Sequence, residues 1–194
     1  DTVEAIAATK AGIIKHGCRA VLYPCGPSVH AVVERRCHEV GASLEVANLD
    51  GLRSVSDTLE GQVFDYGARR GLRLPLLGGH QLKNAAVALT AIDALRQRGW
   101  DIPEDAVRNG LAAVTWPGRF QVVRRDPVVI LDGGHNPQCM ASLAAAIREY
   151  LPGRPVTVLT GVLADKDYGQ MYDILAPAAA RFITVTPPGP ECRT

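Results

Sequence analysis

Hydrophobic and polar positions in the first part of the chain predict alternating helices and strands. Residues 1–15 have apolar residues at helical spacing, and Gly12 suits the end of that helix. Short apolar runs at 19–24 and 43–48 predict two strands on either side of a valine-rich helix. This order of strand, helix and strand is typical of an α/β fold.

The middle of the chain contains a hairpin pattern and then its strongest helical pattern. The stretches FDYG and GLRLPLLG, between residues 60 and 78, predict a hairpin in which Pro75 marks an edge strand or an early end. A continuous apolar stripe predicts a helix from Gln81 to Arg98, and a second helix is expected at 103–113.

The last third of the chain alternates regularly. We expect strand 127–131, helix 137–150, strand 156–162, helix 168–178 and strand 181–185. Such a β-α-β-α-β series predicts parallel strands, as in half of a doubly wound sheet. The polar stretch RRDP before the series is the best linker candidate, so we place a domain boundary near Asp126.

Charge and composition exclude several kinds of partner. The 194-residue chain has a formal net charge of +1 at pH 7, which favours neither nucleic acid nor an anionic membrane. No apolar run approaches the roughly 20 residues that span a bilayer, and the five scattered cysteines form no C-x-x-C pair. We therefore expect a soluble, cytoplasmic monomer. Because the chain opens on Asp1 and stops in the turn-like TPPGPECRT, we also expect both ends to be cut.

The stretch VVILDGGHNP, residues 128–137, is the strongest candidate for a site. If its apolar half is a buried parallel strand, Asp132 emerges at the carboxyl end, where open α/β sheets bind ligands. Asn136 is a favoured N-cap and Pro137 a favoured first helical residue, so His135 would lie where a helix N-terminus attracts phosphate. Alternatively, Asp132 and Asn136 only cap a turn, and this stretch alone leaves both interpretations open.

Five sequence blocks in order resemble the dihydrofolate synthase/folylpolyglutamate synthase family of the Mur ligase superfamily. The blocks are KAGIIKHG at 10–17, LLGGHQLKNAAVALTAI at 76–92, WPGRF at 116–120, LDGGHNP at 131–137 and LADKDY at 163–168. Together they extend over nearly the whole chain, which makes the resemblance far more specific than any single short motif.

The resemblance implies both an architecture and a reaction. Residues 1–125 would be the remainder of a central ATPase domain, and residues 126–194 part of a Rossmann-like C-terminal domain, with the active site in the cleft between them. Similar enzymes use ATP and Mg²⁺ to phosphorylate the carboxylate of dihydropteroate or a folate, and the amine of L-glutamate then attacks the acyl phosphate. Such chemistry relies mainly on positioning and on neutralising phosphate charge.

The resemblance also assigns roles to five residues. Lys10 matches a lysine that is carbamylated and helps arrange the magnesium site, while Asn84 and Arg119 match residues that contact ATP. Asp132 matches a nucleotide-contacting aspartate, and His135 a histidine near the terminal phosphate. By itself, Lys10 favours a cation that complements a helix C-terminus, and the resemblance reverses that preference. Asn84 by itself is compatible with an exposed polar position, and Arg119 with a surface position beside a linker.

Several further positions have two interpretations or depart from the family pattern. Lys166 and Asp167 could contact glutamate, close the cleft or form a solvated ion-pair loop. Trp116 is interpreted as a packing residue at the domain junction rather than a base-stacking platform. Thr9 stands where the family usually has Glu, and Gly134 where it usually has Ala.

The main departure is the absence of a G-x-x-x-x-G-K-[ST] stretch, which in the family lies upstream and holds the ATP phosphates. We therefore expect the middle and part of the end of a larger enzyme, inactive alone. Two alternatives stay open: a ligase for a peptidoglycan precursor, which WPGRF followed by LDGGHNP resembles less, and a non-catalytic nucleotide-binding or interaction module. The sequence does not separate a dihydrofolate synthase from a folylpolyglutamate synthase or an enzyme with both activities.

Overall fold

The computed structural model is a mixed α/β structure, which confirms the predicted fold class. The chain divides into two compact units. Unit 1 comprises Asp1–Val55, Phe64–Leu72 and Leu82–Ala112, and unit 2 comprises Ser56–Val63, Arg73–Gln81 and Ala113–Thr194. The structure describes residues 2–187 of these. Cys192 and most of the turn-like C-terminal stretch lie outside the described residues.

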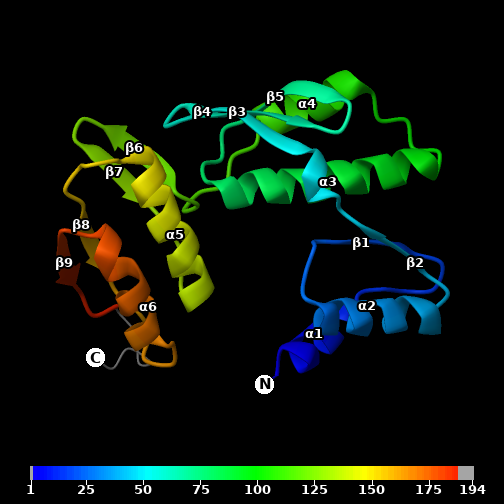
Figure 1. The fold of residues 1–194 in the computed structure, drawn as a ribbon, viewed down its shortest axis with the longest axis horizontal. Coiled ribbons are helices and arrows are strands. Elements are labelled where there is room, and N and C mark those ends of the chain that lie inside the picture. Colours follow the sequence, from blue (N-terminus) through cyan, green and yellow to red (C-terminus); the bar gives the residue numbers. More distant parts are fainter. Residues whose placement is uncertain (1, 188–194) are drawn as a thin grey trace. The chain divides into compact units, whose positions relative to one another are not determined.

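Unit 1 begins with a layer in which two helices accompany a pair of parallel strands (Figure 1). Its elements are α1 (Val3–Ala11), β1 (Arg19–Leu22), α2 (Pro27–Glu39) and β2 (Ser43–Val46). The Thr2 hydroxyl caps α1 by accepting the Ala5 N–H at 3.2 Å, and Gly12 ends the helix. The first predicted helix and both predicted strands are therefore confirmed.

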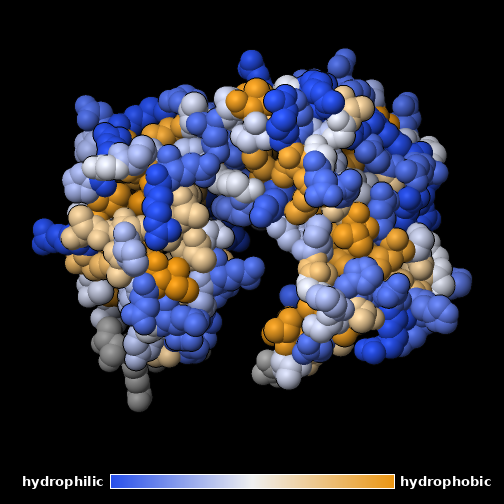
Figure 2. Space-filling view, viewed as in Figure 1, coloured by the Kyte–Doolittle hydropathy of each residue, from blue (hydrophilic) through white to orange (hydrophobic). Residues whose placement is uncertain are grey.

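A small apolar core holds this layer together, and part of its surface stays hydrophobic. Ala11, Ile14 and Val33 are buried against the two strands. Exposed hydrophobic residues remain on α1 and the loop after it, where Val3 and Ile13 are 61% and 80% exposed. Figure 2 shows hydrophobic residues at the surface of this part of unit 1.

A three-stranded sheet and two helices follow, and their residues are divided between the units. The elements are η1 (Leu49–Gly51), β3 (Leu52–Thr58), β4 (Gly61–Tyr66), β5 (Arg69–Leu74), α3 (Gly79–Gln97) and α4 (Glu104–Ala112), with sheet order β3-β4-β5. β4 and β5 are the predicted hairpin, and β5 ends directly before Pro75. The sequence did not predict β3, because its residues LRSVSDT are mostly exposed and have no apolar alternation.

The predicted apolar stripe of α3 faces the interior. Leu82, Ala85, Ala86 and Leu89 are all buried, whereas Lys83 and Asn84 on the same helix are exposed. The helical periodicity therefore identified the buried face of this helix as well as its existence.

Unit 2 contains the β-α-β-α-β series. Its further elements are β6 (Gln121–Arg125), β7 (Val128–Leu131), α5 (Pro137–Tyr150), β8 (Thr157–Thr160), α6 (Tyr168–Leu175), η2 (Ala176–Ala178) and β9 (Arg181–Thr184). β8 and β9 pair in parallel, as predicted. β7 instead pairs antiparallel with β6, because only Asp126 and Pro127 separate these strands and so short a connection permits no parallel pair.

The RRDP stretch, interpreted from sequence as a linker, forms the end of β6 and the turn into β7, and both strands lie in unit 2. The domain boundary near Asp126 stays a prediction. No helix among residues 2–187 is long and apolar enough to cross a membrane. The cytoplasmic location and the monomeric state also stay predictions.

The core of unit 2 is built around α5. Ala144 and Ile147 of this helix are buried, as are Met171 and Leu175 of α6. The same cluster includes Leu77 from the loop before α3, Phe120 from the WPGRF stretch and Tyr150 from the end of α5. One core therefore supports both the loop before α3 and the WPGRF loop.

Candidate functional site

In unit 2, the WPGRF and LDGGHNP loops lie next to each other, and Asp132 joins them. Its Oδ2 accepts the N–H of Phe120 at 2.9 Å, and its Oδ1 accepts the N–H of Gly134 at 2.8 Å. The N–H of Gly133 donates to the carbonyl of Gly118 at 2.8 Å. Two sequence blocks thus form one local structure, which a single carboxylate organises.

The backbone of the WPGRF loop is left-handed at two positions. Gly118 has a φ of 72° and Phe120 a φ of 45°. Glycine adopts this conformation easily, whereas it costs a residue with a Cβ roughly 1–2 kcal/mol of conformational free energy. Phe120 is 3% exposed and bonded to Asp132, so packing and a hydrogen bond hold it there. Backbone strain of this kind clusters at functional sites.

Arg119 lies between these two left-handed residues and is exposed. Among residues 2–187, its guanidinium has no hydrogen-bond or ion-pair partner. A planar guanidinium without an internal partner is well suited to bind phosphate oxygens from solvent.

The N-terminus of α5 lies directly after the LDGGHNP loop. The Asn136 side chain accepts the Cys139 N–H at 2.8 Å, and Pro137 is the first helical residue. Because proline has no N–H and the Cys139 N–H is already bonded, the first turn has fewer free donors than the sequence suggests. The positive end of the helix dipole still favours an anion.

His135 is exposed at this helix end. Its Nδ1 lies 3.0 Å from the carbonyl oxygen of Gly133. Since a carbonyl only accepts, this hydrogen bond requires the proton on Nδ1. The Nε2 atom then accepts a hydrogen bond in the neutral ring and donates one in the charged ring.

The turn-capping interpretation of the LDGGHNP loop is therefore confirmed, since the side chains of Asp132 and Asn136 both accept hydrogen bonds from nearby backbone N–H groups. Capping does not exhaust the Asp132 carboxylate, because each oxygen has more than one lone pair. Its contact with a nucleotide stays a prediction.

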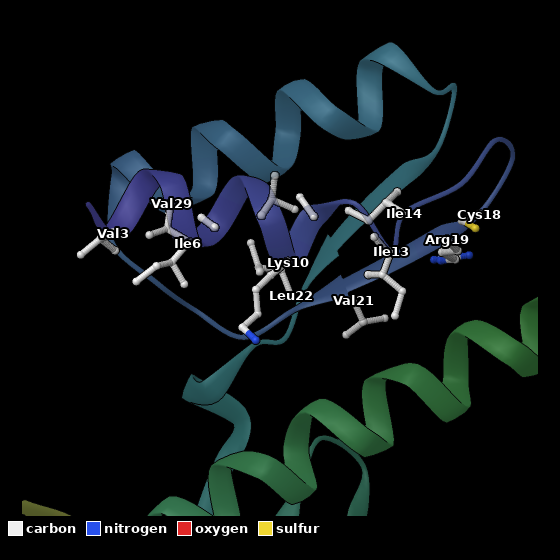
Figure 3. A pocket seen from close by; sticks show the side chains of 14 residues that line it. Val3, Ile6, Lys10, Ile13, Ile14, Cys18, Arg19, Val21, Leu22 and Val29 are labelled. Atoms are coloured by element: carbon white, nitrogen blue, oxygen red, sulfur yellow. The ribbon is translucent and has the colours of Figure 1, made fainter. Parts of the chain in front are cut away.

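The other two predicted site residues lie in unit 1. Lys10 is in the last turn of α1 and lines a pocket of about 540 Å³, whose other lining side chains are mostly apolar and come from α1, β1, α2 and the intervening loop (Figure 3). Lys10 is exposed, and its carbamylation stays a prediction. Asn84 is also exposed and lies in the second turn of α3, because the helix begins earlier than expected, at Gly79.

The described residues do not form a magnesium site by themselves. Mg²⁺ needs near-octahedral oxygen coordination. Residues 2–187 contain no group of three or more His, Cys, Asp or Glu side chains that could hold a metal ion. Lys10, even as a carbamate, would supply only part of a coordination sphere.

The structure bears on two of the other sequence interpretations. In the LADKDY block, Lys166 Nζ lies 2.6 Å from Asp165 Oδ2, and Asp167 caps α6 by accepting the Gln170 N–H at 3.2 Å. This block is thus an ion-pair and capping loop. Trp116 is 60% exposed. Its interpretation as a packing residue at the domain junction stays a prediction.

Sequence reasoning missed Tyr150. This residue is 8% exposed, its hydroxyl donates to Asp57, and the same oxygen accepts the Gly78 N–H at 2.8 Å. Its ring contacts that of Phe120 at a centroid distance of 5.5 Å. No local signal identified it, because a tyrosine on the apolar face of a helix has the pattern of an ordinary core residue.

Comparison with known proteins relates these loops to a group of ligases. Residues 118–193 match the family described as "Mur ligase, glutamate ligase domain". The chain is 36% identical over 202 residues to the folylpolyglutamate synthase of Lacticaseibacillus casei, an alignment that covers 97% of this chain and 45% of that protein. The chain spans about half the length of the curated relatives it matches.

Solved structures agree with the sequence comparison. Mycobacterium tuberculosis folylpolyglutamate synthase complexed with ADP matches with a TM-score of 0.88 at 29% identity, covering 100% of this chain and 45% of that one. A complex of folylpolyglutamate synthase with AMPPCP and folate matches with a TM-score of 0.84 at 33% identity, covering 96% of this chain and 47% of that one.

Proposed function

The chain belongs to the folylpolyglutamate synthase/dihydrofolate synthase family, and we propose from this premise that its protein is an ATP-dependent ligase that adds L-glutamate to a pteroate or folate carboxylate. The observation that carries the proposal is the pair of loops joined by Asp132, which holds Arg119 and His135 exposed beside the N-terminus of α5. Relatives in complex with ADP, or with AMPPCP and folate, support nucleotide and folate as ligands.

The proposed reaction has two steps. A carboxylate oxygen of the pteroate or folate attacks the γ-phosphorus of ATP, so that an O–P bond forms and ADP leaves. The glutamate amine then attacks the acyl carbon, inorganic phosphate leaves, and the amine nitrogen loses a proton to give the amide. In the first step negative charge develops on the departing ADP, and in the second step it develops on the acyl oxygen and the departing phosphate. Positioned cationic groups stabilise such charge.

The chain's own residues would supply part of that stabilisation. Arg119 would bind phosphate oxygens with its unpartnered guanidinium, and the helix dipole of α5 would add to the positive potential. His135 would contact the terminal phosphate through Nε2, while Asp132 and Asn84 would contact the nucleotide. Lys10, if carbamylated, would contribute to the magnesium site, whose coordination sphere the described residues do not complete.

Arg119 provides the direct test. In the complete protein, Arg119→Ala should reduce ATP- and glutamate-dependent turnover by about 10²-fold or more, the effect typical of losing a group that stabilises transition-state charge. Because Arg119 is exposed and has no internal partner among residues 2–187, its removal should leave the melting temperature nearly unchanged.

Arg154→Ala is the matched control, since Arg154 is also an exposed arginine of unit 2. It should retain wild-type turnover. If Arg119→Ala turns over like the control, the assignment of Arg119 to ATP fails. A complete wild-type protein that binds nucleotide but forms no glutamate adduct would instead favour the non-catalytic module.

A further inference from the structure

Tyr150 links three segments of unit 2 that are distant in sequence. It lies at the end of α5 and is 8% exposed. Its hydroxyl donates to the carboxylate of Asp57 on β3 and accepts the N–H of Gly78, in the loop before α3, at 2.8 Å. The hydroxyl therefore uses one donor and one acceptor function on two partners.

The Tyr150 hydroxyl is suited to remain protonated. Burial and its hydrogen bond to Asp57 raise the pKa of the phenol well above its ordinary value. At neutral pH it therefore stays a donor to Asp57. If the hydroxyl were removed, the buried N–H of Gly78 would lose its acceptor, which costs more than a solvent-exposed bond would.

The loop that Tyr150 binds is also restrained from its other side. Gly78 has a φ of 97°, and a Cβ at this position would lie 2.9 Å from the ring of His80. Its carbonyl accepts the side-chain amide of buried Gln62 at 3.2 Å and the N–H of Gln81 at 2.8 Å. The peptide that leads into α3 is thus held in one conformation by β4 and α5 together.

Tyr150 also contacts the WPGRF loop, which carries Arg119. Its ring packs on Phe120 at a centroid distance of 5.5 Å and an interplanar angle of 39°. Phe120 is the strained residue that follows Arg119 and donates to Asp132. The Tyr150 side chain therefore contacts both the loop before α3 and the loop that carries Arg119.

We propose that Tyr150 is a positioning residue for the nucleotide site: through its hydroxyl and ring it fixes the loop before α3 relative to the Arg119 loop within unit 2. This inference rests on the proposed function, because it assumes that these loops bind ATP. Tyr150 itself is not expected to touch the nucleotide.

The test is Tyr150→Phe in the complete protein, which removes the hydroxyl and keeps the ring on Phe120. Titration calorimetry with AMPPCP should show binding about ten-fold weaker than in wild type, the size expected for a lost buried hydrogen bond. Hydrogen exchange at the Gly78 amide should become faster. The KM for glutamate should stay the same, because no part of the linkage is assigned to the glutamate site.

Two further variants separate positioning from general stability. Tyr172→Phe is the matched control, because the Tyr172 ring also packs on a phenylalanine, Phe182, at 5.7 Å, but its hydroxyl has no hydrogen bond among residues 2–187. Asp57→Asn keeps an oxygen that accepts from Tyr150 and should bind AMPPCP like wild type. Asp57→Ala removes the acceptor and should weaken binding in the same direction as Tyr150→Phe.

Each outcome decides one of the two proposals. If Tyr150→Phe binds AMPPCP and exchanges Gly78 like wild type, the positioning role is overturned. A drop in melting temperature and active fraction with unchanged AMPPCP affinity would also overturn it, because a purely structural role predicts that result. Absence of glutamate ligation by the wild-type protein would overturn the proposed function, while the AMPPCP and exchange measurements would still test Tyr150.

Discussion

A single aspartate accounts for much of the order in the loops that carry Arg119 and His135. Asp132 accepts the N–H groups of Phe120 and Gly134 with different oxygens and so ties the two loops together. Charge-assisted bonds from backbone N–H groups to a carboxylate are among the stronger hydrogen bonds in proteins. The exposed side chains of Arg119 and His135 therefore project from loops that this carboxylate holds together.

Gly134 gives a prediction at the same scale. A Cβ there would lie 2.6 Å from Cε of Met140, 2.9 Å from Oδ1 of Asp132 and 3.2 Å from Cβ of Cys139. This crowding is a physical reason for glycine here, where the family resemblance leads one to expect alanine. We expect Gly134→Ala to lower the free energy of unfolding by about 1–2 kcal/mol, measured by urea denaturation.

Gly133→Ala is the control, because its Cβ would meet only the Gly118 carbonyl, at an ordinary 3.4 Å. In a double-mutant cycle, Gly134→Ala should cost less in a Met140→Ala background than in wild type, because the clash involves the flexible end of Met140, although Met140→Ala by itself also destabilises the core. Strictly additive effects of the two substitutions would contradict this explanation.

At the scale of elements, Arg69 joins β5 to α3 and α4 in unit 1. Its guanidinium bonds both carboxylate oxygens of Asp93, at 2.9 and 2.6 Å, and Oε1 of Glu104 at 3.1 Å. The Arg69 side chain is 14% exposed, and its hydrogen bond lowers the pKa of Asp93. Burial raises the pKa of Glu104, but hydrogen bonds from Arg96 and Arg69 outweigh this effect, so the pKa of Glu104 is lowered as well.

Arg69→Lys should therefore destabilise unit 1, because an ammonium cannot form the same forked contacts. We expect a loss of about 1–3 kcal/mol at pH 7 in urea denaturation. The folded-state pKa values of Asp93 and Glu104 are lowered, so the network stabilises the fold above the unfolded carboxyl pKa of about 4 and loses this effect as pH falls.

The difference between wild type and Arg69→Lys should accordingly be larger at pH 7 than at pH 3. Arg35→Lys on α2 is the control, because Arg35 is exposed and its side chain has no partner in the described part of the chain. It should change the free energy of unfolding by less than about 0.5 kcal/mol at either pH. Equal losses of unfolding free energy in the two variants would show that the Arg69 network does not stabilise unit 1.

At the scale of the whole molecule, the proposed site depends on groups that the 194-residue sequence does not contain. It has no G-x-x-x-x-G-K-[ST] stretch, whose backbone N–H groups and lysine hold phosphates in P-loop proteins. The five candidate residues are also divided between the units, with Lys10 and Asn84 in unit 1 and the other three in unit 2.

We therefore expect the 194-residue chain by itself to form no glutamate adduct above the background without enzyme, in an assay with ATP, Mg²⁺, glutamate and a folate substrate. The complete protein is the positive control and should turn over. Turnover by the isolated chain at a rate close to that of the complete protein would show that the phosphate-holding stretch is dispensable.

The sequence determined the features that depend on neighbours along the chain. Periodicity identified α3 and its buried face, short apolar runs located β1 and β2, the FDYG and GLRLPLLG stretches located the β4–β5 hairpin, and the Asn-Pro pair located the start of α5. These features follow from local geometry, because 3.6-residue and two-residue repeats, caps and proline constraints act within a few positions. The block order likewise identified the family before any contact was known.

Only the tertiary structure decided which distant groups meet. It paired β7 with β6, made Asp132 the link between two loops, left Lys10 exposed and brought Tyr150 to Gly78 and Asp57. A polar strand such as β3 and a buried tyrosine on an apolar helix face have no distinctive local pattern. Their roles arise from contacts between segments far apart in sequence, where packing and hydrogen-bond satisfaction select one arrangement among many that the same local patterns allow.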